Sequence, residues 1–346
     1  MTTLDVRFGG RLDTAGWARR HAAGEVPDRW PYGLDRLAKQ GFTLVERPAA
    51  VAPGPLARGL RAVGGYEWWE TRQYDRTASD LVVCWDERVG VPAAERTGRG
   101  RPPVATGVIW LTDRTRYAAA HRALAGPALR RAHRVWALSS AQLPLLRDAL
   151  RVPSTRLRHL LFGVDADFFT PDGTDPVPGL VVSVGNDRHR DHGLVVAAMA
   201  MVAEKHACAR LELATRSTVD VPAAFGVRHP RLSHVELRDL YRRASVIAVA
   251  LHPNLHVSGV TVALEAMAVG RPVIITGTPG MSDYVTDGGT GVLVPPGDAH
   301  ALATAVSGLL SDPARAAALG EAGRVSVAER LNSAAQAERL ADLLRD

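Results

Sequence analysis

The sequence predicts an α/β protein with two domains, each built on a parallel β-sheet that is covered by helices. Short apolar segments rich in β-branched residues alternate with longer segments rich in Ala, Leu and Arg along the whole chain. This alternation is typical of βαβ units, whose strands pair in parallel. The 346 residues also exceed the length at which one hydrophobic core usually stops growing, so two domains are expected.

Each predicted strand is a short apolar run bounded by polar or turn-forming residues. Runs of this length and composition are typical of strands that are buried on both faces. In chain order the predicted strands are Leu4–Phe8, Thr43–Glu46, Leu81–Trp85, Val104–Leu111, Arg134–Leu138, Leu180–Val184, Arg210–Ala214, Val246–Ala250 and Pro272–Thr276. The Ala-rich segments between them are predicted helices.

The segment 165–177 interrupts both patterns. It contains Pro171, Gly173 and Pro176 and has the period of neither a helix nor a strand, which is typical of an exposed connection. We therefore expect two Rossmann-like domains that face each other, over residues 1–172 and 173–324. A C-terminal helix over 325–346 could pack back on the first domain.

The composition argues against several classes of protein. The 42 Lys and Arg residues give a net charge of +6 and are spread along the chain without a basic stripe, which argues against a nucleic-acid partner. The longest apolar runs are too short for a transmembrane segment, and residues 1–10 lack the pattern of a secretory signal, so a cytoplasmic protein is expected. Two cysteines, Cys84 and Cys208, are too few for a disulfide framework.

The most informative stretch joins a predicted strand to a helix through a loop of small residues. The loop His252–Gly259 follows the strand Val246–Ala250 and leads into a predicted helix that starts at Val260. The first N–H groups of a helix lack partners within it and bind anions, so we expect a diphosphate here. The predicted contacts are Ser258, Gly259, Val260 and Thr261. Glu265 lies one turn further on, where a carboxylate can accept hydrogen bonds from both hydroxyls of a ribose.

Several motifs in the second half of the chain form a recognisable set. They are Leu264-Glu-Ala-Met-Ala268, Gly270-Arg-Pro-Val273, Pro279-Gly280, the run from Val285 to Asp298, and the run from Phe162 to Pro171. Together they resemble the donor-binding half of GT-B fold glycosyltransferases, especially the large retaining family 4. The resemblance implies two Rossmann-like domains across a cleft, a nucleotide-sugar donor on the second and a small-molecule or glycan acceptor on the first. It also implies that Glu265 binds the donor ribose and that transfer retains the anomeric configuration.

A second motif ends a predicted strand at Gly185 and continues into a polar loop. In the family that the chain resembles, this loop supplies a basic side chain to the donor diphosphate, and Arg188 and Arg190 lie in similar positions. Arg suits that role because its planar guanidinium group can form hydrogen bonds to two phosphate oxygens at once. We expect Arg190 to act and the other to be a solvated charge, while Gly185 permits close approach of the backbone to the ligand. Arg216, just after the next strand, could reach the base or the phosphates.

The chain departs from the family at one position. Family members usually have a second Glu eight residues before the ribose Glu, and Val257 stands there in this chain. The donor sugar must therefore be contacted differently, and His256 and Ser258 are neighbours that could substitute. His256 could equally be a solvated loop residue. The departure also leaves open a degenerate protein that binds a nucleotide without turnover.

The first half of the chain carries weaker motifs. Gly9 and Gly10 follow the first predicted strand and resemble a glycine loop that borders donor phosphates, although two glycines also suit an ordinary turn. Asp86 and Asp113 follow two further strands, and either could take a proton from an acceptor group at the edge of the sheet. The alternatives are a helix cap at Asp113 and a solvated pair of Asp86 with Glu87.

No metal and no organic cofactor is expected. The loops carry no paired carboxylates of the D-x-D kind and the His residues lack metal-ligand spacing, so Arg190 and main-chain amides would stabilise the leaving diphosphate alone.

A nicotinamide-dependent oxidoreductase is a rival function, but neither Phe8-Gly-Gly nor Val184-Gly continues into the G-x-G-x-x-G turn that such an enzyme needs. The sequence leaves open the acceptor, the base, the sugar, and whether the chain forms a homodimer.

Overall fold

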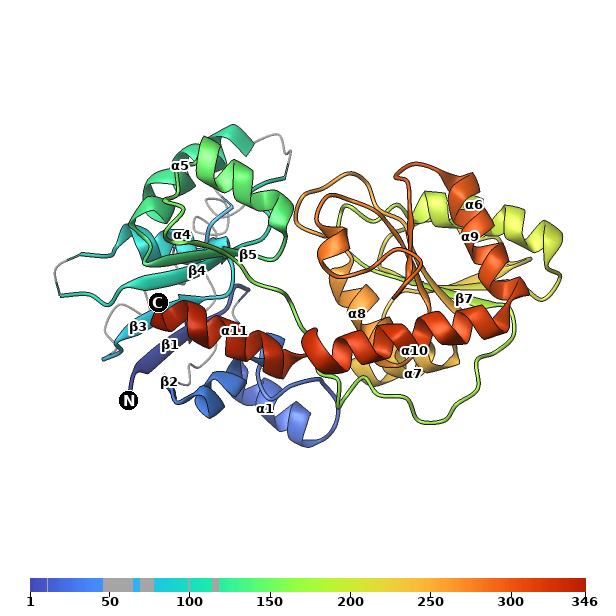
Figure 1. Cartoon of the computed structure of the whole chain (residues 1–346), viewed down its shortest axis with the longest axis horizontal. Helices are drawn as coiled ribbons and strands as arrows, with labels where there is room; N and C mark the ends of the chain where they lie inside the picture. Colours follow the sequence, from blue (N-terminus) through green and yellow to red (C-terminus); the bar gives the residue numbers. More distant parts are fainter. Residues whose placement is uncertain (11, 46–64, 69–77, 99, 114–117) are drawn as a thin grey trace. The chain divides into compact units, whose positions relative to one another are not determined.

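The chain folds into two compact units, each with its own sheet (Figure 1). The computed structural model describes residues 1–10, 12–45, 65–68, 78–98, 100–113 and 118–346. The first unit consists of residues 1–22, 28–161 and 336–346, and the second of residues 23–27 and 162–335. None of the described helices combines the length and the apolar character that a bilayer span requires.

The first unit contains a six-stranded sheet in the order β2-β1-β3-β4-β5-β6, with every neighbouring pair parallel. The strands are β1 (Thr3–Arg7), β2 (Thr43–Val45), β3 (Leu81–Cys84), β4 (Val104–Val108), β5 (Arg134–Ala137) and β6 (Leu157–His159). The helical segments are α1 (Thr14–Ala22), η1 (Pro31–Gln40), α4 (Glu87–Glu95), α5 (Ala118–Arg131), η2 (Ser140–Gln142), η3 (Leu145–Ala149) and most of α11 (Ser333–Arg345). Since β1 leads to β2 on one side and the chain returns to β3 on the other, the strand order switches between β1 and β3.

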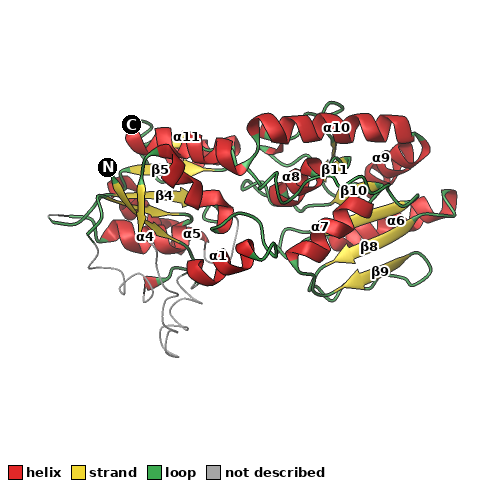
Figure 2. Ribbon diagram, turned by 90° about the horizontal axis from the view of Figure 1, so that it is seen from below, coloured by secondary structure: helices red, strands yellow, loops and turns green. Residues whose placement is uncertain are grey.

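The second unit contains a parallel sheet in the order β12-β11-β10-β7-β8-β9. Its strands are β7 (Leu180–Val184), β8 (Arg210–Ala214), β9 (Gly226–His229), β10 (Val246–Val249), β11 (Val273–Thr276) and β12 (Val292–Val294). Its helical segments are α6 (His192–Lys205), α7 (His234–Arg243), α8 (Val260–Ala268), η4 (Met281–Asp283), α9 (Ala299–Ser311) and α10 (Pro313–Arg330) (Figure 2). Here the strand order switches between β7 and β10, and ligands of such sheets bind beyond the carboxyl ends of the strands at that point.

The core of the second unit explains why its strands are apolar on both faces. Strand residues such as Val181, Leu211 and Ile274 are fully buried and pack with Met199 of α6 and Leu302 of α9. A parallel sheet is covered by helices, so its strands lack the polar face of an exposed antiparallel sheet. The predicted α/β fold with two parallel sheets is confirmed.

All nine predicted strands are present, and the structure adds β6, β9 and β12. The sequence analysis missed these three because they are short segments of three or four residues that are largely half-buried. Such segments carry no sustained apolar run, and only pairing with a neighbouring strand makes them part of a sheet.

The chain passes into the second unit after Leu161, earlier than the expected boundary at residue 172. The segment that follows is bound to the second unit by its own contacts. The Phe162 N–H donates to the Tyr284 hydroxyl (3.0 Å), and the ring of Phe169 lies 6.3 Å from that of Tyr241. These long-range contacts assign the segment to the second unit. The turn-forming residues at 171–176, on which the sequence prediction of the boundary depends, carry no information about such contacts.

Candidate functional site

The loops that follow β7 and β10 lie side by side at the switch point of the second sheet. The Asp191 N–H donates to the Ala250 carbonyl (2.9 Å), and the His252 N–H donates to the His189 carbonyl (2.8 Å). These main-chain bonds fix the position of Arg190, which lies between them in the first loop. The switch point is where doubly wound sheets bind ligands, so the two loops form the candidate site.

Arg190 lies between two glycines. An added Cβ atom at Gly185, just after β7, or at Gly259, just before α8, would overlap the end of the Arg190 side chain. The Nε and Nη1 atoms of Arg190 are buried, and neither has an acceptor among the residues that the structure describes. Burial lowers the pKa of Arg190, whereas the charges of Asp187 and Glu265 oppose this shift. A buried cation with unused donors indicates a site for an anion.

The start of α8 offers fewer amides than the sequence predicts. The Ser258 N–H donates to Oδ1 of Asn254 (3.0 Å), and the Val260 N–H donates to the carbonyl three residues before it (3.0 Å). Gly259, the N-cap residue, has φ 92°. Within the described residues, no hydrogen-bond partner is found for the N–H groups of Gly259 and Thr261. These two amides are therefore the donors at the start of α8 that could meet an anion.

Glu265 is buried on α8, one turn past Thr261. It is 7% exposed, and its Oε2 accepts a hydrogen bond from the Tyr241 hydroxyl (3.0 Å). Burial raises the pKa of Glu265 to about 8, although the Tyr241 bond and the charge of Arg190 oppose the rise. From the sequence alone Tyr241 looks like a core residue, and the structure adds a polar role because α7 brings its hydroxyl to Glu265.

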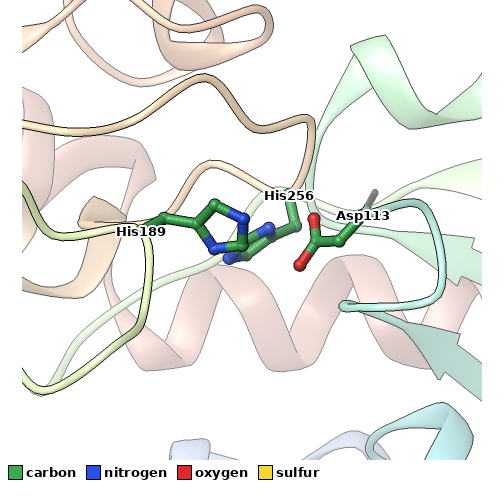
Figure 3. Close-up of side chains that lie close together, drawn as sticks. All are labelled: Asp113, His189 and His256. Atoms are coloured by element: carbon green, nitrogen blue, oxygen red, sulfur yellow. The ribbon is translucent and has the colours of Figure 1, made fainter. Parts of the chain in front are cut away.

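Asp187 organises the side chains around Ser258. Its Oδ1 accepts hydrogen bonds from the Ser258 hydroxyl (2.9 Å) and the His189 N–H (2.8 Å), and Nε2 of His256 lies 3.9 Å from Oδ2. The rings of His189 and His256 come from the two loops and meet edge to face, with centroids 4.9 Å apart (Figure 3). Burial alone would raise the pKa of Asp187, but the His189 N–H, His256 and Ser258 together lower it. His256 is buried, so it is not the solvated loop residue that the sequence leaves open.

Two adjoining hollows open beside these loops. One has a volume of about 340 Å³, and the three predicted cations Arg188, Arg190 and Arg216 all line it. The other, of about 380 Å³, shares Arg216 with the first, and its lining includes apolar side chains such as Leu232 and Leu237 together with polar ones such as His229 and Arg231. The structure therefore brings the three arginines to one place, next to a hollow of mixed apolar and polar lining.

The glycine pair after β1 is already occupied by the protein's own charged side chains. The Gly10 N–H donates to both carboxylate oxygens of Glu67 (2.9 and 3.0 Å). An added Cβ atom at Gly9 would overlap the guanidinium of Arg88. The chain supplies the anion at this turn itself, so the Gly10 amide does not remain available to a phosphate. Glu67 is distant in the sequence, and nothing in the pattern around Gly10 points to it.

Asp86 caps a helix. Its Oδ1 accepts a hydrogen bond from the Arg88 N–H (2.9 Å), and its Oδ2 lies 2.7 Å from Nη2 of Arg88. Both oxygens are therefore engaged, and Asp86 and Glu87 are buried, which corrects the expectation of a solvated pair. An N-cap that is ion-paired in this way is not poised to take a proton from an acceptor.

Asp113 lies in the segment that follows β4. It is buried, and its N–H donates to the Trp110 carbonyl (3.0 Å). The same loop is held by Glu87, whose carboxylate accepts hydrogen bonds from the N–H groups of Ile109 (2.8 Å) and Trp110 (2.7 Å). Asp113 thus has a fixed backbone, and its role as a proton acceptor stays a prediction.

A family model matches most of the second unit by sequence. Residues 178–312 match the family described as glycosyl transferases group 1. A D-inositol 3-phosphate glycosyltransferase of Kribbella flavida is 39% identical over 118 residues, which are 34% of this chain and 26% of that protein. The GDP-mannose-dependent alpha-(1-6)-phosphatidylinositol monomannoside mannosyltransferase of Mycolicibacterium smegmatis is 31% identical over 217 residues, 56% of this chain and 57% of that protein. The chain thus spans less than two thirds of the length of either relative.

Solved structures are similar over the whole chain. A sucrose-phosphate synthase from Thermosynechococcus elongatus has a TM-score of 0.77 at 21% identity, with 100% of this chain and 98% of that chain covered. Anabaena HepE in complex with UDP and glucose has a TM-score of 0.75 at 13% identity, with both chains fully covered. At these identities the likeness establishes the fold alone. The chain therefore has the fold of the GT-B glycosyltransferases, and its residues 178–312 are similar in sequence to the glycosyl transferases group 1 family.

Proposed function

We propose that the chain is a glycosyltransferase that moves a sugar from a nucleotide-diphosphate sugar, held by the second unit, to an acceptor. The relatives with curated names are glycosyltransferases. The observation that carries the proposal is the buried guanidinium of Arg190, whose Nε and Nη1 have no acceptor among the described residues. It lies at the switch point of the sheet beside two unpaired amides, and a diphosphate supplies the charge and the oxygens that this arrangement lacks.

The two hollows suit the two ends of a nucleoside diphosphate. The cationic hollow, lined by Arg188, Arg190 and Arg216, suits the phosphates. The adjoining hollow combines the apolar side chains of Leu232 and Leu237 with polar groups such as His229, and this combination suits a base with apolar faces and polar edges. Glu265 follows the anion-binding amides by one turn and is the group that we expect to bind the ribose. Among the similar structures, HepE has been crystallised with UDP and with UDP-glucose.

Stabilisation of the leaving diphosphate is the catalytic task that these residues can perform. Cleavage of the anomeric bond leaves negative charge on the diphosphate, and Arg190 with the amides of Gly259 and Thr261 would receive it in a buried, preorganised setting. No step in this scheme needs a metal ion, so we expect turnover in the presence of a chelator. We also propose retention of the anomeric configuration, which an NMR spectrum of the product would test.

Replacement of Arg190 tests the donor site. Arg190→Gln removes a charged pair of hydrogen bonds to phosphate, so we expect the affinity for UDP or GDP to fall by about ten- to a hundredfold. Thermal shift and calorimetry with both nucleotides measure this, because a ligand of the folded state raises its Tm. Arg315→Gln, at an exposed position of α10, is the control. Equal affinity in the wild type and the Arg190 variant would refute the assignment.

A protein that binds the nucleotide without turnover is the second candidate, and Val257 favours it. Val257 is fully buried and has φ 50°, a strained conformation for a β-branched residue. It stands where the resemblance expects a Glu. Release of UDP from UDP-glucose or of GDP from GDP-mannose, measured with a panel of acceptors, separates the candidates: binding without any release favours the second.

A further inference from the structure

Tyr241 and Glu265 form a buried polar pair in the second unit, near Arg190. The Tyr241 hydroxyl donates to Oε2 of Glu265 (3.0 Å), and both side chains are buried. Oε1 of Glu265 accepts no hydrogen bond from the residues that the structure describes. The carboxyl group therefore has one oxygen bonded within the chain and one that remains available.

The charges of Glu265 and Arg190 act on each other, yet the two side chains are not paired. Burial lowers the pKa of Arg190, and the charges of Asp187, Tyr241 and Glu265 oppose this shift. Burial raises the pKa of Glu265, and the Tyr241 hydrogen bond and the charge of Arg190 oppose the rise. Nε and Nη1 of Arg190 nevertheless have no acceptor among the described residues. Opposite charges attract strongly in a buried place, so their separation needs a physical reason.

The hydroxyl of Tyr241 supplies that reason. Burial and the charge of Glu265 raise the pKa of Tyr241 well above its ordinary value, so the hydroxyl keeps its proton and remains a donor. Its hydrogen bond satisfies Oε2 of Glu265 without the guanidinium group of Arg190. Because the two oxygens of a carboxyl group point in different directions, the same bond also directs Oε1 away from Tyr241.

The packing of α7 fixes the position of this hydroxyl. The helix begins with a capping box in which the side chains of Ser233 and Glu236 each bind the main-chain N–H of the other residue. The Tyr241 ring lies 6.3 Å from the ring of Phe169, which meets Phe168 edge to face at 5.0 Å. A hydroxyl on a buried, closely packed ring is preorganised, so it can orient its partner.

We propose that Tyr241 is a positioning residue that holds the carboxyl group of Glu265 away from Arg190. The guanidinium group of Arg190 then stays open to a diphosphate, and Oε1 of Glu265 stays available to a ribose. Tyr241 acts through Glu265, because its own side chain is fully buried. The consequence for ligands rests on the proposed donor site, whereas the separation of the two side chains is a property of the free protein.

NMR of the free protein tests the separation without a ligand. Once the Tyr241 hydroxyl is removed, we expect Glu265 to bind Arg190, so Tyr241→Phe should move the Nε resonance of Arg190. The absence of that resonance in Arg190→Gln assigns it. In the background of Glu265→Met, which has no carboxylate, Tyr241→Phe should leave the resonance in place. The spectra are recorded at about pH 9, because Glu265 is charged only above its pKa of about 8.

Inorganic pyrophosphate tests the consequence for ligands, with calorimetry at the same pH. We expect Tyr241→Phe to weaken pyrophosphate binding roughly three- to tenfold, because the guanidinium group must first release the carboxylate. In the Glu265→Met background the same substitution should leave the affinity unchanged. A role of Tyr241 in packing alone predicts an equal loss in both backgrounds.

Tyr284→Phe is the matched control, because it removes another buried tyrosine hydroxyl, one that accepts a hydrogen bond from the Phe162 N–H (3.0 Å). It should lower the Tm without moving the Arg190 resonance or changing the affinity for pyrophosphate. An unmoved Arg190 resonance in a folded Tyr241→Phe variant, or the same movement with and without the Glu265 carboxylate, would overturn the proposal. If the wild type binds neither pyrophosphate nor UDP nor GDP, the donor site is refuted, and the NMR result alone decides the role of Tyr241.

Discussion

Two oppositely charged side chains in the second unit are buried where an anion is expected to bind. Arg190 has unused buried donors, and Glu265 is bonded to the Tyr241 hydroxyl. An ionised carboxylate is costly in a buried place, so Glu265 keeps its proton to a higher pH than an ordinary Glu does. The charge of Glu265 is therefore sensitive to pH.

The titration of Glu265 predicts how the stability of the second unit changes with pH. Its pKa is raised from 4.5 to about 8 in the folded chain, so the folded state binds more protons than the unfolded state between these values. This group therefore stabilises the fold below about pH 4.5, and its contribution is lost as the pH rises through about 8. Glu265→Gln cannot titrate, so we expect its Tm relative to the wild type to increase between about pH 5 and pH 8. A difference in Tm that does not change with pH would contradict this.

Gly259→Ala tests whether the glycine is needed for the position of Arg190. Alanine at φ 92° is strained by about 1 to 2 kcal/mol, and its Cβ would overlap the Arg190 guanidinium. We expect a lower Tm and a weaker affinity for UDP or GDP. Gly297→Ala is the control: its φ is 76°, and among the described residues no atom lies within 4 Å of an added Cβ. The control should lose stability but keep nucleotide affinity, and loss of affinity in both variants would show that strain alone is the cause.

At the scale of elements, α4 of the first unit fixes the loop after β4. Glu87 in the first turn of the helix accepts two main-chain hydrogen bonds from that loop, and Nε2 of Gln142 donates to the Ile109 carbonyl (2.8 Å). The guanidinium of Arg88 lies over the Trp110 ring at 4.7 Å. The loop that carries Asp113 is thus held by side chains of other elements.

Removal of the Glu87 carboxylate should release this loop. Glu87→Ala leaves the N–H groups of Ile109 and Trp110 without their acceptor, so we expect a loss of about 2 to 3 kcal/mol in the free energy of unfolding. Chemical denaturation measures it. Glu95→Ala, at the other end of α4 and half-buried, serves for comparison and should cost less than about 1 kcal/mol. An equal effect of the two substitutions would mean that the carboxylate does not hold the loop.

At the scale of the whole molecule, the described chain has two sheets with separate hydrophobic cores. The residues that we propose to hold the nucleotide all belong to the second unit. We therefore expect a bound nucleotide to report on the second unit.

Hydrogen exchange with a nucleotide tests this separation. UDP or GDP should slow amide exchange in the loops 185–191 and 215–217 and at the start of α8, because bound phosphates protect these amides. Strands β1 and β3 of the first unit should exchange as they do without the nucleotide. Protection confined to the first unit would place the nucleotide elsewhere and contradict the donor-site assignment.

Much of the fold and part of the site could be predicted from the sequence. The alternation of apolar runs with Ala-rich segments depends on neighbours in the chain, and all nine predicted strands form. The turn with Gly259 before α8 follows from local chemistry in the same way. Short strands such as β6 and β9 could not be predicted, because pairing with another strand defines them.

The sequence by itself determined the two parallel sheets, the loop that carries Arg190 and the helix that carries Glu265, because short-range periodicity and turn chemistry specify these. Only the tertiary structure decided which polar groups remain available to a ligand and which are bonded within the chain. It filled the Gly10 turn with the carboxylate of Glu67, engaged Asp86 with Arg88, and placed Tyr241 against Glu265. The hydrogen bonds and the burial of these side chains depend on which segments distant in the sequence come into contact. Those contacts are set by the packing of the sheets and helices.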